Sequence, residues 1–155
     1  MLENIKLILF DFDDTLCIHH KRGYTEKDEF ELDLRIYKGK EPWVNHSTNK
    51  HMKLFLEECE HKNIKLGLLS VVSNFKHAQA KEKWILENYN IKLENFCVGT
   101  DEEKIRQLEI IAKAYELKNE EILIIDDKQS ILNEVSLLGF LAWSPMEVVN
   151  YIEEK

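Results

Sequence analysis

Two short apolar segments of this chain end in closely spaced aspartates. The segments are Leu7-Ile8-Leu9-Phe10, which leads into Asp11 and Asp13, and Ile122-Leu123-Ile124-Ile125, which leads into Asp126 and Asp127. Four-residue runs rich in Leu and Ile are typical of strands that are buried on both faces of a sheet. Because ligands bind at the carboxyl ends of the strands in an open parallel sheet, we expect these acids to meet at a ligand-binding edge.

Carboxylates that converge on one edge repel one another unless a cation lies between them. A site built only from oxygen ligands favours a hard ion such as Mg²⁺. The pattern therefore predicts a magnesium site with a spare carboxylate beside it, which is the outline of a site for phosphoryl transfer.

Strand-like and helix-like patterns alternate along most of the chain. Strands are predicted over residues 5–10, 64–69, 96–98, 122–125 and 140–143. Helices are predicted over residues 51–62, 78–89, 101–117, 129–138 and 145–153. Strands and helices in turn require right-handed crossovers, so we predict an α/β fold: a doubly wound parallel sheet with helices on both faces.

Composition narrows the class of protein. A chain of 155 residues with 44% hydrophobic and 32% charged residues fits one soluble globular domain. No apolar run approaches the roughly 18 residues that cross a bilayer. The first residues lack the basic start and long apolar stretch of a secretion signal, and the three cysteines are widely spaced. We therefore expect a cytoplasmic protein with no membrane association.

The net charge of −8 disfavours passive binding to nucleic acid or to an anionic membrane. It does not exclude a nucleotide that is held through its phosphate and a metal ion. We expect the partner to be a small phosphorylated substrate.

The hexapeptide Asp11-Phe12-Asp13-Asp14-Thr15-Leu16 resembles the first signature of the haloacid dehalogenase (HAD) superfamily, most of whose members are phosphatases. The other three signatures of that family have matches in the right order, namely Ser70 after Leu68-Leu69, Lys104, and the pair Asp126-Asp127. These matches cover most of the chain except residues 17–49. The resemblance implies one HAD-like hydrolase domain over residues 1–155, with a Rossmann-like core whose first strand is central and lies beside the strand of Asp126.

The resemblance makes Asp11 the nucleophile, and a carboxylate needs no deprotonation at neutral pH to attack phosphorus. Asp13 is then the general acid and base, with a pKa that we expect to be raised by its charged neighbours. The alternative interpretation is that Asp11 or Asp13 only caps a following helix or turn.

Ser70 and Lys104 are the candidate ligands of the phosphoryl group. Ser70 directly ends a predicted strand, although Ser73 offers a competing register because two valines follow Ser70. Lys104 lies near the start of a predicted helix, where a cation would hold phosphoryl oxygens and offset the carboxylates. Arg106 is the nearest substitute for it.

The resemblance also implies a set of ligands for Mg²⁺. Asp126 would bind the ion directly together with Asp11 and the backbone carbonyl of Asp13. Asp127 would bind it through a water molecule or orient Lys104. A structural alternative is that Asp127 is the N-cap of the helix predicted from residue 129.

Residues 17–49 match no signature and are too few for a large helical cap domain, so we expect a short flap of the small-cap or capless type. The basic stretch His19-His20-Lys21-Arg22 would contact a phosphorylated substrate or simply be a solvated loop. Residues 30–37 alternate between apolar and polar, which predicts a strand of a hairpin flap with Trp43 packed under it.

The sequence thus predicts a Mg²⁺-dependent, HAD-like phosphoric monoester hydrolase that works through an aspartyl phosphate. One alternative is a nucleotidase acting on nucleoside monophosphates, suggested by residues 83–86 and Asn95-Phe96. The other is a non-catalytic phosphoacceptor domain similar to a response regulator, which also uses aspartates at strand ends, Mg²⁺ and a lysine. Such a domain would not need an acid at Asp13.

Overall fold

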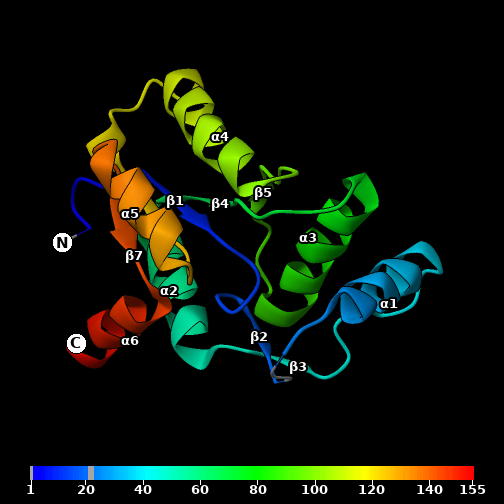
Figure 1. Cartoon of the computed structure of the whole chain (residues 1–155). Helices are drawn as coiled ribbons and strands as arrows, with labels where there is room; N and C mark the ends of the chain where they lie inside the picture. Colours follow the sequence, from blue (N-terminus) through cyan, green and yellow to red (C-terminus); the bar gives the residue numbers. More distant parts are fainter. Residues whose placement is uncertain (1, 21–22) are drawn as a thin grey trace.

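The computed structural model describes residues 2–20 and 23–155 and has a parallel sheet of five strands at its centre (Figure 1). The strand order is β5-β4-β1-β6-β7. The strands of this sheet are β1 (Leu7–Phe10), β4 (Lys65–Leu68), β5 (Glu94–Asn95), β6 (Ile122–Ile125) and β7 (Leu141–Trp143). The α/β fold with a doubly wound parallel sheet is confirmed, and β1 lies at the centre beside β6, as the resemblance implied.

Helices cover both faces of the sheet. They are α1 (Glu26–Tyr37), α2 (Lys50–His61), α3 (Phe75–Tyr89), α4 (Asp101–Ala114), α5 (Gln129–Leu137) and α6 (Pro145–Glu153). Ile8 and Phe10 of β1 belong to a core shared with α2, α3 and α6, whereas Leu7 and Leu9 belong to a second core shared with α4 and α5. This split follows from the alternation of side chains along a strand. It explains why the apolar run of β1 is continuous.

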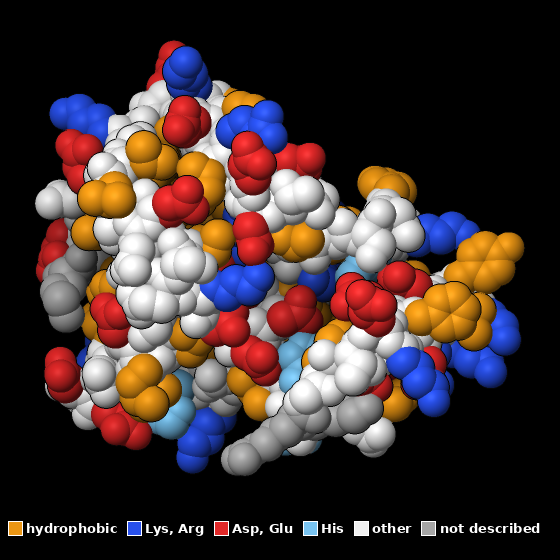
Figure 2. Space-filling view, viewed as in Figure 1, with side chains coloured by type: hydrophobic (Ala, Val, Ile, Leu, Met, Phe, Trp, Pro, Cys, Tyr) orange, Lys and Arg blue, Asp and Glu red, His pale blue; other side chains and the backbone are white. Residues whose placement is uncertain are grey.

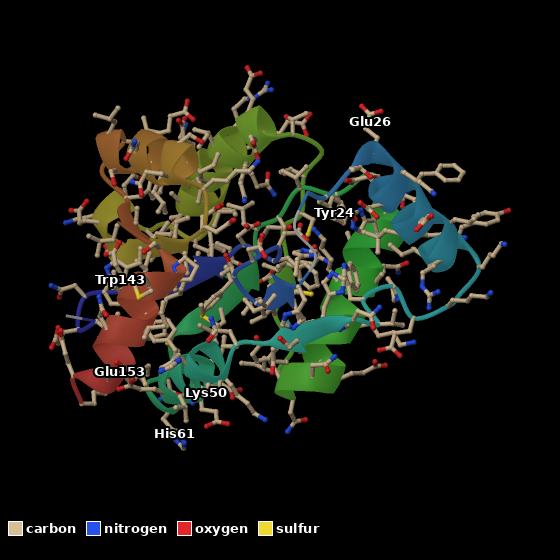
Figure 3. All side chains as sticks on the ribbon, turned by 60° about the horizontal axis from the view of Figure 1, so that its bottom comes forward. Tyr24, Glu26, Lys50, His61, Trp143 and Glu153 are labelled. Carbon is tan, nitrogen blue, oxygen red and sulfur yellow. The ribbon has the colours of Figure 1, made fainter. Side chains whose placement is uncertain are left out.

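Helices α2 and α6 lie side by side on one face of the sheet (Figure 3). The rings of Phe55 and Tyr151 meet edge to face, with centroids 5.6 Å apart.

Close packing in strand β4 requires a glycine at position 67. A Cβ on Gly67 would come within 2.8 Å of the Leu9 side chain and 2.9 Å of the Phe96 side chain.

The strand predicted at residues 96–98 is displaced along the chain. The structure has β5 at Glu94–Asn95, and Val98 makes only an isolated parallel bridge to Val71. The pairing of this edge of the sheet therefore continues beyond the regular strand, toward the residues that follow β4.

The strand predicted over residues 30–37 is wrong, because these residues form most of helix α1. Thr25 and Asp28 form a capping box at its start, which satisfies backbone N–H groups of the first turn. Leu32 and Ile36, four residues apart, are turned toward the core, whereas Phe30 is exposed. An alternating pattern of eight residues also contains such pairs at helical spacing, so the capping box decided the outcome.

The flap at residues 17–49 has α1 between two short strands, β2 (Cys17–His19) and β3 (His46–Thr48), which pair antiparallel. The helix packs against α3 at one side of the molecule (Figure 1). Trp43 is buried, as expected, and its ring lies 4.8 Å from that of Phe12. Trp43 of the flap therefore packs against the core at Phe12, the residue between Asp11 and Asp13.

None of the described helices is both long enough and apolar enough to cross a membrane.

Candidate active site

Asp11 and Asp126 lie side by side at the carboxyl edge of the sheet. They follow β1 and β6, which are neighbours with Phe10 opposite Ile125. The backbone N–H of Asp11 donates to the carbonyl of Ile125 at 2.9 Å, and that of Asp126 donates to Trp143 at 3.1 Å. The sheet register itself therefore brings the two aspartates together, as the sequence predicted.

Asp127 completes a cluster of three carboxylates with Asp11 and Asp126, whose candidate ligand oxygens all lie within 4.8 Å of one another. Burial raises the pKa of Asp11 well above its usual range; Lys104 opposes this rise, and the charge of Asp126 adds to it. Three carboxylates in this cluster face one ammonium, that of Lys104, so the formal charge of the group is negative. A set of oxygen donors with excess negative charge fits a hard divalent cation.

Lys104 points from the first turn of α4 into this cluster. Its Nζ donates to Oδ2 of Asp126 at 2.6 Å and to Oδ1 of Asp11 at 3.1 Å. Burial lowers the pKa of Lys104, but the two aspartates outweigh burial and raise it, so the side chain stays an ammonium. Arg106, the alternative candidate, is exposed. The structure thus brings Lys104 to the aspartates, at the position that the spacing indicated.

Two of the roles considered for Asp127 do not fit the structure. Helix α5 begins after Lys128, so Asp127 is not its N-cap. The backbone N–H of Lys128 instead donates to Oδ1 of Asp126 at 2.9 Å. The hydrogen bonds of the Lys104 ammonium go to Asp11 and Asp126, so orientation of this lysine by Asp127 finds no support. Asp127 is exposed at the mouth of the cluster, where it remains a candidate metal ligand.

Asp13 lies apart from the three clustered carboxylates, and both of its oxygens have partners. Its Oδ1 is 2.7 Å from Nε2 of His19, and its Oδ2 accepts from Nζ of Lys81 at 3.1 Å. The expected rise in its pKa is wrong. Burial raises the pKa of Asp13, but the hydrogen bond from His19 and the charge of Lys81 outweigh burial and hold it below its usual range. In this structure Asp13 is therefore ionised at neutral pH.

Lys81 is a site residue that the sequence analysis missed. It lies on α3 and is only 1% exposed. Its Nζ also donates to Oγ of Ser70 at 2.8 Å and to the carbonyl of Val71 at 3.0 Å. A signal was present, because Lys81 falls between Ala78 and Ile85 on the apolar, inward stripe of its helix.

The structure favours Ser70 over Ser73 as the serine of the site. Ser70 lies beyond the carboxyl end of β4, is 1% exposed and shares Lys81 with Asp13. Ser73 is exposed in the turn before α3, where its backbone N–H donates to Nδ1 of His77 at 3.1 Å. The two valines that raised the doubt about register lie between these positions.

The flap contributes a pair of histidines. Nδ1 of His19 lies 2.6 Å from Nε2 of His46, so strands β2 and β3 place the two rings in contact behind Asp13. His20 is exposed, and its ring lies 2.9 Å from Oγ of Ser47. Lys21 and Arg22, the other residues of the predicted basic contact, lie outside the described residues. The role found for His19 is thus contact with Asp13, a partner that the sequence did not indicate.

A cavity of about 410 Å³ lies beside Asp13, between the flap and the core. Figure 2 shows this side of the molecule hollowed between the part that carries α1 and the rest, with acidic and histidine side chains in the hollow. Residues that line it include Asp13, His19, Tyr24, Glu29, Leu32 and His77. A space of this size beside Asp13 can hold a small molecule.

No family model matches the sequence, and no curated protein matches it. Solved structures do match. The chain is 19% identical to a cobalt-bound deoxy-D-mannose-octulosonate 8-phosphate phosphatase from Haemophilus influenzae, with a TM-score of 0.57 over 92% of this chain and 70% of that one. It is 14% identical to a HAD family enzyme from Bacteroides thetaiotaomicron in complex with magnesium and inorganic phosphate, with a TM-score of 0.55 over 90% of this chain and 93% of that one.

A third solved structure is a dehalogenase with an intermediate complex. It is 12% identical, with a TM-score of 0.62 over 92% of this chain and 85% of that one. At these identities the likeness concerns the fold. The chain has the fold of HAD superfamily enzymes, which confirms at that level the resemblance found in the sequence.

Proposed function

We propose that this protein is a HAD superfamily phosphatase that hydrolyses a phosphomonoester through an aspartyl phosphate. The observation that carries the proposal is the division of labour between Asp11 and Asp13. Asp11 belongs to the carboxylate cluster with Lys104, whereas Asp13, two residues on, is held separately by His19 and Lys81. A nucleophile and a separate acid and base are the two carboxyl groups that this hydrolysis requires.

In the first step, a carboxylate oxygen of Asp11 attacks phosphorus and the bond from phosphorus to the ester oxygen breaks. Asp13 is the group placed to give a proton to the departing oxygen. A bound phosphoryl group brings negative charge close to Asp13 and so favours its protonated form. In this proposal Ser70 and Lys104 hold phosphoryl oxygens by donating hydrogen bonds.

In the second step, water attacks the phosphorus of the aspartyl phosphate, which releases inorganic phosphate and restores the Asp11 carboxylate. Asp13 takes a proton from that water. The hydrogen bond from His19 and the charge of Lys81 lower the pKa of Asp13 against the effect of burial, so the side chain is ionised and can accept a proton when water arrives.

The side chains of Asp11, Asp126 and Asp127, with the backbone carbonyl of Asp13, are the proposed holders of Mg²⁺. When bound, this ion would neutralise charge on the transferring phosphoryl group. The three carboxylates of the cluster outnumber the single ammonium of Lys104, and this formal negative charge supports a cation at this place.

The cavity beside Asp13 supports a small phosphorylated substrate whose leaving group enters between flap and core. The contacts that hold Asp13, from His19 and Lys81, also favour an enzyme over a phosphoacceptor domain, because such a domain does not need a positioned acid and base. The nucleotidase alternative loses part of its basis, because Trp84 is buried in the core with its ring 5.4 Å from that of Phe12.

The test is release of inorganic phosphate from p-nitrophenyl phosphate in the presence of Mg²⁺, with Asp11→Asn as the control. We expect steady turnover by the natural chain and none by the variant. A chain that takes a phosphoryl group from acetyl phosphate but releases no phosphate from any ester would be a phosphoacceptor domain, and the proposal would fail.

A further inference from the structure

The ammonium of Lys81 uses all three of its donors on groups of the site. Its partners are Oδ2 of Asp13, Oγ of Ser70 and the carbonyl of Val71, at 3.1, 2.8 and 3.0 Å. The side chain also crosses the face of the Phe12 ring, with Nζ 4.9 Å from its centroid. A lysine that is 1% exposed and saturated in this way has no donor left for a substrate.

The contact with Lys81 sets the direction of the Ser70 hydroxyl. Lysine donates and never accepts, so Oγ of Ser70 must accept in this hydrogen bond. The hydroxyl hydrogen of Ser70 is thereby left to point away from Lys81. Ser70 follows β4 and Asp11 follows β1, and these two strands are neighbours in the sheet. The serine is held as a donor, which is the form that a phosphoryl oxygen requires.

The same ammonium joins two loops that leave neighbouring strands. Asp13 follows β1, Ser70 and Val71 follow β4, and these strands pair in parallel. Lys81 comes from α3 and reaches both loops at once. A single charged group therefore fixes the distance between the acid and base and the serine hydroxyl.

We propose that Lys81 is a positioning residue that acts through Asp13 and Ser70, fixing the place of the Asp13 carboxyl group and holding the Ser70 hydroxyl as a hydrogen-bond donor. This inference rests on the proposed phosphatase function and adds a second lysine to Lys104. Lys104 contacts Asp11 and Asp126, whereas Lys81 contacts the other half of the site. One ammonium group thus holds Asp11 and Asp126, and the other holds Asp13 and Ser70.

The test is a double-mutant cycle in kcat/KM for p-nitrophenyl phosphate, built from Lys81→Met, Ser70→Ala and the double variant. Methionine keeps the length of lysine and removes its charge and donors. We expect Lys81→Met to lower kcat about 100-fold and to change KM less than about threefold, because Lys81 has no donor free for the substrate. In the Ser70→Ala background the same substitution should cost at least about fivefold less, because one of its two targets is gone.

The matched control is Lys83→Met, which removes an exposed lysine of the same helix that pairs with Glu87. It should leave kcat and KM unchanged. If Lys81→Met does not fold, as judged by circular dichroism, Lys81→Gln takes its place in the cycle. The amide of glutamine can still donate hydrogen bonds but carries no charge.

The role of Lys81 would be overturned if the variants fold and the losses of kcat/KM in the two single variants multiply to give the loss in the double variant. A Lys81 variant with the natural kcat would also overturn it. Either result leaves the phosphatase proposal intact. A rise in KM without a fall in kcat would also overturn the role of Lys81, since that marks direct binding of substrate. If the natural chain itself releases no phosphate, the proposed function fails and this inference fails with it.

Discussion

Nζ of Lys104 lies 2.6 Å from Oδ2 of Asp126, and both side chains are buried. One comes from the first turn of α4 and the other from the end of β6, so the pair ties a helix to the sheet edge at the candidate site. Lys104 also forms an ion pair with Asp11 at 3.1 Å, and among the described residues it is the only cation paired with the cluster of three carboxylates.

Replacing Lys104 with Met should destabilise the protein by about 3–5 kcal/mol when no divalent cation is present, because it leaves buried carboxylates without their partner. Urea unfolding in the presence of EDTA measures this. Mg²⁺ should restore part of the loss, since a bound ion supplies the missing positive charge. Arg106→Met is the control, and at an exposed position it should change stability by less than about 0.5 kcal/mol. Equal stability of both variants would contradict the pairing.

Activity should depend on a divalent cation. The cluster of Asp11, Asp126 and Asp127 carries more negative charge than Lys104 offsets, so we expect EDTA to abolish turnover and added Mg²⁺ to restore it. In the same samples the thermal midpoint should rise with Mg²⁺ concentration. Full turnover in EDTA, checked by elemental analysis of the protein, would remove the metal from the proposal.

Asp11→Asn and Asp13→Asn should fail at different steps. An amide at position 11 cannot form the aspartyl phosphate, so no phosphoenzyme should be detected by intact-protein mass. An amide at position 13 cannot take a proton from water, so hydrolysis should slow by about 100-fold or more while phosphoenzyme accumulates. Asp14→Asn, at an exposed neighbouring position, is the control. A phosphoenzyme on Asp11→Asn would assign the nucleophile to another residue.

The carboxylate edge was readable from the sequence because two features coincide there. The runs before Asp11 and Asp126 are apolar on both faces, which identifies central strands, and the acids follow without an intervening turn. Lys104 was found by its match to the third family signature, supported by its place near the start of a helix and its spacing to Asp126. These are local patterns, and local patterns are what a sequence displays directly.

The rest of the site depends on contacts between distant segments. Lys81 falls on the inward stripe of its helix, but only the packing of α3 against the sheet shows that its ammonium lies beside Ser70 and Asp13. His19 meets Asp13 because β2 begins beside the segment that follows β1, with a bridge between Asp13 and Cys17. The hydrogen bond from His19 then lowers the pKa of Asp13, where a rise was expected. Helix α1 was misread for a different reason, since its short alternating pattern fits both periods.

The pH dependence of stability should report on His77. Burial, together with the nearby charge of Lys81, lowers the pKa of its ring to about 4. The unfolded chain then binds more protons than the folded chain between pH 6.5 and about 4. The stability due to a neutral His77 is therefore present above pH 6.5 and is lost as the pH falls, by about 2 kcal/mol between pH 7 and pH 5.

Urea unfolding at the two pH values tests this with His77→Gln, which cannot gain a proton. The variant should lose about 2 kcal/mol less than the natural chain on going from pH 7 to pH 5. His61→Gln, at an exposed histidine of α2, should behave as the natural chain does (Figure 3). Identical pH dependence in all three proteins would show that His77 is not buried in the neutral form.

The flap should select the substrate through the cavity beside Asp13. Tyr24 and Glu29 line this cavity and, among the described residues, form no hydrogen bond or ion pair with Asp11, Asp13, Asp126 or the lysines of the site. The ring of Tyr24 lies near that of His19, with centroids 5.7 Å apart, but the hydrogen bond between His19 and Asp13 does not involve Tyr24 and is kept when Tyr24 is changed. Replacing all of His19-His20-Lys21-Arg22 would not be a clean test, because His19 is bonded to Asp13. Tyr24 lies two residues before the first residue of α1, Glu26 (Figure 3).

We expect Tyr24→Ala with Glu29→Ala to raise KM about 10-fold for a bulky phosphomonoester found in a substrate screen, while kcat for acetyl phosphate, which has no group large enough to fill the cavity, stays within about twofold. Phe30→Ala, on the exposed side of α1, is the matched control and should change neither value. If the double variant and the control behaved alike with the bulky ester, its leaving group would lie outside this cavity, and the flap would have no part in choosing the substrate.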